Sequence, residues 1–482
     1  MAEAELLTWA LSNGITDAPS AATPCIGHSL TISNFPEAGG RGLAAARDLK
    51  EGELILVVPQ TALLNVDSFE GDVHVKKALQ LFPHFSSFQI LVALLLREVW
   101  KGSLSRWFVY LKTLPRSYHT FVQYSNYEIQ ALQADDAVWT AEHAVATAHK
   151  EWIETKPFLG ILGLKGRFVT FKAWQWACST VSSRTLHVPW SSAGTLCPMG
   201  DLFNYAPPGN THAEGTKTPS YCNLSDTHVE NLFLVEEMGL VEGSELDKDE
   251  AGGDLYFTDR LTDGGFDLNS CCYYFYAREN YKKGDQVLLC YGLHTNLDLL
   301  QHYGFILPDN PNDKVFIRLD DFSGFTPTLL PEQLTAWMKH GSMHIEVDGR
   351  PSFQFLAVLR LYFAPGEVRQ HKGHLALSGQ QLCVENDIIV YQQLKETCST
   401  ILKKFPSTML MDSALGHIIC LCSSFDGLTG VDIRCVHKLL STRRSCKKVS
   451  GQDQQPATFH AVGSSKTRVC LLPLSRSSND TV

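Results

Sequence analysis

The sequence predicts an α+β protein in which a β-rich domain is split by a helical insertion and followed by a mainly helical C-terminal domain. Two stretches, residues 29–64 and 197–307, have β texture, because short apolar and β-branched runs alternate there with glycine turns. Between and after them, apolar residues recur at helical spacing. The order of β, helical and again β segments indicates one sheet-containing domain with an insertion, not two independent sheets.

The composition is that of a folded protein with a sizeable core. Of the 482 residues, 44% are hydrophobic and 19% are charged, which fits about two to four domains. The formal charge of −10 argues against nucleic acid as a partner, because phosphate neutralisation drives such binding. A basic protein segment is a better partner. The longest apolar run, residues 90–96, is too short to span a bilayer, so we expect no membrane contact.

The cysteines and the N-terminus indicate an intracellular protein. Fourteen cysteines are scattered without regular spacing, and the acidic first residues lack the basic region of a secretory signal. We therefore expect reduced thiols, a cytoplasmic or nuclear location and a monomer. Cys271 and Cys272 have no partners at zinc-site spacing, and we expect no metal.

The predicted elements follow changes of texture along the chain. Residues 5–11 predict a short amphipathic helix, and Phe88, Leu91 and Leu95 lie on one face of a longer one. The predicted divisions are an N-terminal helix in 1–24, a first β part in 25–66, a helical insertion in 67–180, a second β part in 181–310 with an acidic loop at about 236–267, a helical domain in 311–440, and a disordered basic tail in 441–482.

Glycines cluster early in the first β part. Gly40 and Gly42 flank Arg41, and glycine lets the backbone approach a ligand closely, with φ values that other residues resist. The same three residues equally suit a plain turn between strands. They are not a dinucleotide fingerprint, because no Gly-x-Gly-x-x-Gly follows a strand here.

Three polar residues lie near the start of the second β part. Arg184 ends a tryptophan-rich helix, where it either binds a carboxylate through two hydrogen bonds or is an exposed arginine favourable to the helix dipole. Asp201 and Asn204, three positions apart, would face the same side of a helical turn. The Asn204 amide suits a cofactor amine or a purine edge. Alternatively, the pair is a capping aspartate and a turn asparagine.

The most informative segment closes the second β part. An apolar strand ending at Cys290, which we interpret as a packing residue, runs into Tyr291. A helical turn over residues 293–300 follows, and Tyr303 and Phe305 end the segment. Each tyrosine precedes a glycine, and the pair can bring two phenols to one pocket. Phenols in a narrow, dry channel can orient an incoming amine and help to remove its proton.

In this order the segments resemble the SET-domain methyltransferases, in the subgroup typified by the Rubisco large-subunit lysine methyltransferase and the actin-histidine methyltransferase. That family has a Gly-x-Gly, a helical insertion, an Arg-bearing helix, an Asp-x-x-Asn-His segment and a closing Tyr…Asn…Leu-Leu…Tyr-Gly-Phe. The likeness covers roughly residues 27–310, and residues 107–115, to which we assign no chemistry, resemble part of the insertion. The matching residues are Gly40 to Gly42, Arg184, Asp201 to Tyr205, Tyr291, Asn296, Leu299, Leu300 and Tyr303 to Phe305.

The resemblance implies an S-adenosylmethionine-dependent protein methyltransferase that needs no metal, and we expect protein-lysine N-methylation of a non-histone substrate. It also implies that the helices after residue 311 are a substrate-binding domain. The implied cofactor-binding residues are Gly40, Arg41, Gly42, Arg184 (toward the cofactor carboxylate), Asn204, Tyr205, Tyr291 and Phe305 (flat against the adenine). The implied catalytic residues are Tyr291 and Tyr303, and these line the substrate channel together with Asp201.

One position departs from the family pattern, because Tyr205 stands where the family commonly has histidine. Backbone contacts to an adenine would survive that change, whereas a contact that needs the imidazole would not. This departure leaves open a SET-like module that binds a peptide without catalysis. A protein-histidine methyltransferase also stays open, because a neutral imidazole needs little lowering of its pKa to react.

Overall fold

The computed structural model describes residues 2–35, 40–208, 263–307, 310–322 and 343–404. Helices and mostly antiparallel sheets occupy separate stretches of the described chain, which confirms the predicted α+β class. The predicted tail lies outside the described residues, and so does the predicted acidic loop except for residues 263–267.

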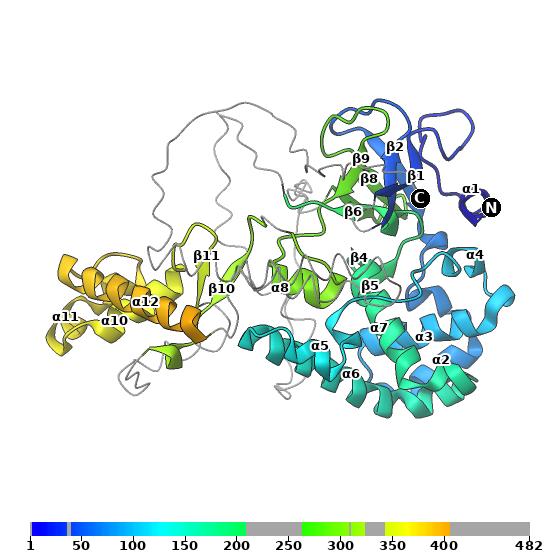
Figure 1. Cartoon of the computed structure of the whole chain (residues 1–482). Coiled ribbons are helices and arrows are strands. Elements are labelled where there is room, and N and C mark those ends of the chain that lie inside the picture. Colours follow the sequence, from blue (N-terminus) through cyan, green and yellow to red (C-terminus); the bar gives the residue numbers. More distant parts are fainter. Residues whose placement is uncertain (1, 36–39, 209–262, 308–309, 323–342, 405–482) are drawn as a thin grey trace, which may run out of the picture.

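Strands from both sides of the insertion pair in the same sheets (Figure 1). The strands are β1 Leu30–Phe35, β2 Gly40–Ala45, β3 Leu54–Pro59, β4 Thr185–Val188, β5 Ser191–Leu196, β6 Asn204–Tyr205, β7 Gly264–Asp267, β8 Cys272–Tyr276 and β9 Gln286–Leu289. One sheet has the order β1-β2-β9-β6, another β3-β8-β7, and β4 pairs with β5. β2 is antiparallel to β9, and β6 is parallel to it. The two β parts therefore complete one another.

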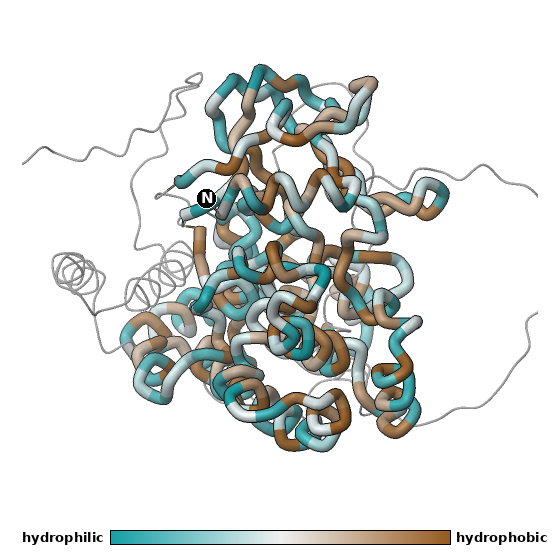
Figure 2. The backbone as a smooth tube through the Cα atoms, turned by 90° about the vertical axis from the view of Figure 1, so that its right-hand side faces the viewer, coloured by the Kyte–Doolittle hydropathy of each residue, from teal (hydrophilic) through white to brown (hydrophobic). Residues whose placement is uncertain are grey.

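The helices between the two β parts pack into the same core as the sheets. They are α2 Val73–Leu81, α3 Ser87–Lys101, α4 Phe108–Leu111, α5 Asn126–Gln130, α6 Asp135–Ile161 and α7 Phe171–Arg184. Ser86 and Gln89 form a capping box that starts α3. Trp174 of α7 and Phe275 of β8 are both fully buried in one apolar cluster with α3. Brown and teal segments alternate along the helices in Figure 2, as expected of amphipathic elements with one face toward this core.

Short turns complete the described chain. The 3₁₀ turns are η2 Gln60–Ala62, η3 Asp67–Phe69, η4 Gly102–Leu104, η5 Phe121–Gln123, η6 Gly166–Val169, η7 Gly200–Leu202 and η11 Leu319–Asp321.

The first helix, α1 Ala2–Ser12, packs against α4. Trp9 of α1 donates from its indole to the carbonyl of Arg106, at 2.9 Å. The N-terminal helix is thereby attached to the middle of the insertion.

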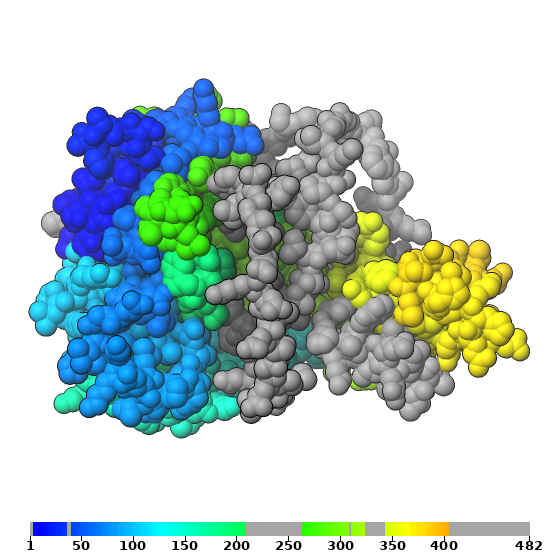
Figure 3. Space-filling view, turned by 180° about the vertical axis from the view of Figure 1, so that it is seen from behind, coloured from blue at the N-terminus to red at the C-terminus, as the bar shows by residue number. Residues whose placement is uncertain are grey.

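The C-terminal elements form a lobe with an apolar core of its own. They are β10 Lys314–Phe316, β11 His344–Glu346, α10 Phe353–Phe363, α11 Gly366–Leu377 and α12 Val384–Lys404. Figure 3 shows this lobe in yellow at one end of the molecule, opposite the N-terminal residues in blue. Arg360 of α10 pairs through two nitrogens with Asp387 of α12, at 2.7 and 2.8 Å, which joins these two helices.

A helical segment follows Tyr291 as predicted, but it begins and ends later than residues 293–300, and its second part is not an α-helix. A short helix, α8 Asn296–Asp298, begins at a capping box of Thr295 and Asp298. It runs into a π-helix, η10 Leu299–Tyr303, which ends at Gly304 in the left-handed region (φ 77°). Apolar periodicity does not distinguish a π-turn from an α-turn over so few residues, because both turn one face inward.

We predict that Gly304→Ala destabilises the fold more than Gly284→Ala does. Both glycines have positive φ, 77° and 92°, so each alanine costs about 1–2 kcal/mol of backbone strain. At Gly304 a Cβ would also lie 2.7 Å from the carbonyl carbon of His119, whereas nothing lies within 4 Å at Gly284. The clash should add about 1–3 kcal/mol. Urea unfolding of both variants measures the difference, and equal losses of stability would contradict the close contact.

Candidate active site

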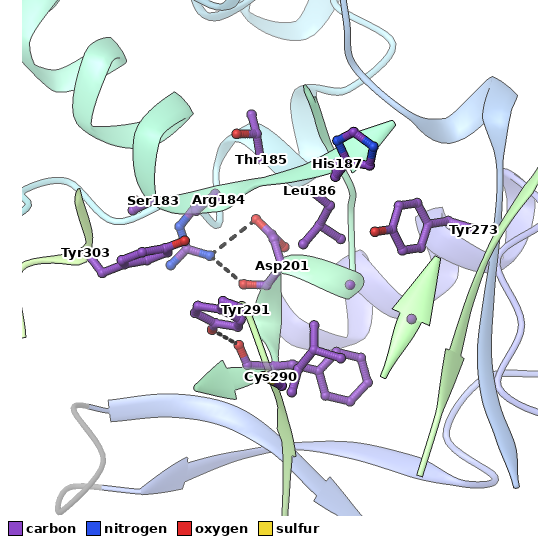
Figure 4. Close-up of a pocket in the computed structure, with 14 residues that line it drawn as sticks. Ser183, Arg184, Thr185, Leu186, His187, Asp201, Tyr273, Cys290, Tyr291 and Tyr303 are labelled. Atoms are coloured by element: carbon purple, nitrogen blue, oxygen red, sulfur yellow. Dashed lines mark hydrogen bonds and ion pairs between the residues drawn. The ribbon is translucent and has the colours of Figure 1, made fainter. Parts of the chain in front are cut away.

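A pocket opens where β4, η7, β9 and η10 meet (Figure 4). Its space is about 610 Å³, part of it open to solvent. Two phenols, of Tyr291 and Tyr303, and the ion pair of Arg184 with Asp201 face this space. Most of the remaining wall is apolar or aromatic, and Ser183, Thr185 and His187 add polar groups to it. The apolar and aromatic residues are Leu186, Phe203, Tyr273, Leu289 and Cys290.

The two predicted catalytic tyrosines lie side by side, with ring centres 5.2 Å apart. Tyr291 follows β9, and its hydroxyl donates a hydrogen bond to the carbonyl of Phe203. Tyr303 ends the π-helix. Burial raises the pKa of both phenols well above the usual value. Both are therefore uncharged near neutral pH, and the Tyr291 oxygen keeps lone pairs to accept a further hydrogen bond.

Arg184 and Asp201 form a buried ion pair beside the tyrosines. Arg184 ends α7, and its Nη1 donates to the backbone carbonyl and to Oδ2 of Asp201, at 2.9 and 3.2 Å. Burial lowers the pKa of Arg184, but Asp201, together with the phenols of Tyr118 and Tyr110, raises it by more, so the guanidinium stays charged. With its side chain 18% exposed, Arg184 is not the exposed helix-terminal arginine of the alternative interpretation.

Asp201 and Asn204 do not share a helical turn. Asp201 belongs to η7 and Asn204 to β6, because the chain extends at Phe203 to pair with β9. Asn204 instead lies against Gly42: a Cβ on Gly42 would be 2.6 Å from Asn204 Nδ2 and 3.2 Å from Gln286 Nε2. Both amide nitrogens are buried without a hydrogen-bond partner. The Gly42 backbone therefore lies beside two donors that a polar ligand could satisfy.

Arg41 connects the glycine segment to the insertion. Its Nη2 donates to the carbonyl of Thr113 at 2.6 Å. Burial, and then the nearby Arg184, lower its pKa. Two guanidiniums thus lie near the single carboxylate of Asp201. Gly40 beside it has φ 115°, a value that favours glycine.

Tyr205 and Phe305 belong to an aromatic cluster around the catalytic tyrosines. The Tyr205 ring centre lies 5.2 Å from that of Tyr291 and 6.0 Å from that of Phe305. Its hydroxyl donates to the carbonyl of Gly292 at 3.0 Å, and burial raises its pKa to about 12. His294 is a further neighbour, at 6.1 Å between ring centres. Tyr205 thus ties β6 to the turn after Tyr291, a role that does not need an imidazole.

Two contributors to the site were missed in the sequence. Residues 107–115 were expected to carry no chemistry, yet the hydroxyl of Tyr110 donates to Asp201 Oδ2 at 2.8 Å. No spacing rule connects positions 110 and 201, which meet only because α4 packs beside η7. Gln286 was missed as well. It lies in β9, the strand that pairs with the glycine-containing strand β2. Cys290 is buried as expected, and it also lines the pocket.

The described chain contains no group of three or more His, Cys, Asp or Glu side chains placed to hold a metal ion. Among the same residues, no helix combines the length and apolar character needed to cross a membrane.

Comparison with known proteins identifies relatives along most of the chain. Protein SET DOMAIN GROUP 40 of Arabidopsis thaliana is 43% identical over 418 residues, which are 86% of this chain and 79% of that protein. The actin-histidine N-methyltransferase of Xenopus tropicalis is 26% identical over 85% of this chain, which spans 63% of that protein's length. No family model matches the chain.

Solved structures share the fold. The SET domain of LSMT bound to lysine and AdoHcy has a TM-score of 0.62 at 16% identity, covering 94% of this chain and 90% of that one. Rubisco LSMT bound to AdoMet gives 0.60 at 17% identity, with 94% and 91% covered. Together with the relatives and the ordered motifs, these similarities establish that the chain belongs to the SET-domain protein methyltransferases, in the subgroup of SET DOMAIN GROUP 40, the actin-histidine methyltransferases and Rubisco LSMT.

Proposed function

We propose that this protein is an S-adenosylmethionine-dependent protein methyltransferase that transfers the methyl group to a lysine of a non-histone protein. The observation that carries the proposal is the pair of partly buried, uncharged phenols of Tyr291 and Tyr303 that line a largely apolar pocket. Relatives named for methyl transfer support the reaction class. We also propose that the C-terminal lobe contacts the protein substrate, that no metal takes part, and that the protein is a monomer of the cytoplasm or nucleus.

The chain's polar groups fit the proposed cofactor. Asn204 Nδ2, Gln286 Nε2 and Arg184 Nε are buried without hydrogen-bond partners. They suit the acceptor atoms of an amino-acid carboxylate and a nucleoside, with Arg184 nearest the carboxylate in this assignment. When bound, S-adenosylmethionine supplies an electrophilic methyl carbon attached to a positively charged sulfur. Phe305 and Tyr205 offer aromatic surface beside this region.

The pocket's chemistry constrains how the acceptor nitrogen reacts. A protonated lysine has no lone pair, and its ordinary pKa is about 10.4. Burial among Leu186, Leu289 and Cys290 lowers that pKa, because the charged form loses hydration. The phenol of Tyr291 has a raised pKa and already donates to Phe203. Tyr291 therefore orients the amine by accepting a hydrogen bond, while the amine proton leaves to solvent.

The pocket wall favours lysine over histidine. A histidine ring that attacks through one nitrogen buries an N–H on the other, which favours a polar partner, whereas the methylene chain of lysine suits an apolar channel. Leu186, Phe203 and Leu289 line such a channel, and Ser183, Thr185 and His187 are the polar groups on the same wall. Histidine is the second candidate, because the actin-histidine methyltransferases are relatives.

We predict that Gly42→Ala abolishes most binding of S-adenosylhomocysteine, the demethylated form of the cofactor. The added Cβ would lie 2.6 Å from Asn204 Nδ2, and so it displaces an amide that we assign to the cofactor. We expect the affinity measured by calorimetry to fall about 10-fold or more, which corresponds to the loss of about one hydrogen bond between neutral groups. Gly265→Ala is the matched control, because nothing lies within 4 Å of a Cβ there. Unchanged affinity in Gly42→Ala would remove this cofactor site.

We predict that Tyr291→Phe lowers kcat by about 100-fold while cofactor and peptide affinities stay within about twofold. The variant keeps the ring but loses the hydroxyl that orients the acceptor, an interaction of about 2–3 kcal/mol. Tyr281→Phe, in the same β domain, serves as control and should retain activity. Methylation of cell-extract protein from a radiolabelled donor measures the effect. A wild-type protein that binds peptide but labels nothing would favour the non-catalytic module.

The pH dependence of kcat separates the two acceptors. With lysine, the neutral amine grows as pH rises, so the rate should increase between about pH 7 and 9. With histidine, whose free pKa is about 6.5, the rate should be flat across that range. The raised pKa values of Tyr291 and Tyr303 keep both phenols protonated throughout. A flat profile would therefore contradict the lysine assignment.

A further inference from the structure

We propose that Tyr110 is a positioning residue that keeps Arg184 available for the carboxylate of the cofactor. It does so by holding Asp201 so that only one carboxylate oxygen, Oδ2, pairs with Arg184. This inference rests on the proposed function, because it concerns the amino-acid end of the same cofactor. It assigns a role at the site to a side chain of the helical insertion, which comes from α4 and not from the β domain.

The contacts place Tyr110 and Arg184 on the same carboxylate oxygen. The hydroxyl of Tyr110 donates to Asp201 Oδ2 at 2.8 Å, and Arg184 Nη1 reaches the same oxygen at the longer distance of 3.2 Å. The other carboxylate oxygen, Oδ1, and the Nε of Arg184 are both buried without partners. A carboxylate free to turn would place both oxygens on the guanidinium, since two-point pairing is the stronger arrangement.

The local charge balance makes this restraint consequential. Burial, and then the nearby Arg184, lower the pKa of Arg41, whereas Asp201 raises the pKa of both arginines and Glu3 raises that of Arg41. Asp201 is the carboxylate bonded to Arg184, and it also acts on Arg41, so the Arg184 end of the cluster suits one additional anion. If Asp201 paired fully with Arg184, that guanidinium would have less attraction for a ligand carboxylate.

Tyr110 is itself held firmly enough to impose a geometry. Its side chain is 1% exposed. Its ring stacks on Trp9 of α1, with centres 6.4 Å apart and planes 16° apart, while the Trp9 indole is bonded to the carbonyl of Arg106. Asp201 is fixed from its other side by a backbone hydrogen bond to Cys197 at 2.9 Å. The hydroxyl therefore meets the carboxylate at a defined place between α4 and η7.

The test is Tyr110→Phe, measured by calorimetry with two ligands on the same preparation of full-length protein. S-adenosylhomocysteine carries the amino-acid carboxylate, whereas 5′-methylthioadenosine lacks the whole amino-acid end. We expect the variant to bind S-adenosylhomocysteine about 10-fold more weakly and 5′-methylthioadenosine within about twofold of wild type, because only the first ligand needs Arg184. Tyr281→Phe controls for the loss of a buried phenol hydroxyl and should change neither affinity.

The ratio of the two affinities distinguishes this role from a structural one. Equal weakening of both ligands would mean that Tyr110 only supports the fold, and unchanged binding of both would mean that it does not position Asp201; either result overturns the proposal. Partial unfolding of the variant does not alter the ratio, since both ligands meet the same protein. If wild-type protein binds neither ligand, the proposed function fails, and this role fails with it.

Discussion

The site depends on the hydrogen bond from the Tyr291 hydroxyl to the carbonyl of Phe203. Phe203 precedes β6 and Tyr291 follows β9, and these two strands run parallel, with Asn204 opposite Leu288. The strand pairing already holds the two chain segments together, so the main effect of the bond is to use the only hydrogen that the phenol can donate. A buried, uncharged phenol that has already donated can act toward an amine only as an acceptor. This restriction determines which chemical role Tyr291 can have.

The sheet that supports this bond contains strands from both the first and the second β part. β2 pairs with β9, so Gly42 of the first β part lies beside Gln286 and Asn204 of the second. Position 42 needs a glycine because a Cβ there would overlap the Asn204 amide, and not because its φ angle is one that only glycine adopts. The same pairing leaves two amides without acceptors, and a protein tolerates such groups where a ligand can satisfy them.

The insertion contributes to the site as well as to the core. Arg41 is bonded to Thr113, and Asp201 to Tyr110, so the segment around α4 contacts both the glycine segment and the acid at the pocket. α1 covers this segment through Trp9. The charges near the pocket are therefore arranged by three parts of the chain: the N-terminal helix, the insertion and the β domain.

The sequence by itself determined the α+β class, the family and the identity of the candidate residues, because strand and helix periodicity and ordered motifs are local properties. Tyr291, Tyr303, Arg184 and Asp201 do line one pocket, and Gly42 does lie against Asn204. Only the tertiary structure decided that Arg184 is paired with Asp201, that η10 is a π-helix, and that Tyr110 reaches the site. Those features arise from contacts between residues far apart in the chain, and no local pattern encodes which distant partner a polar side chain will meet.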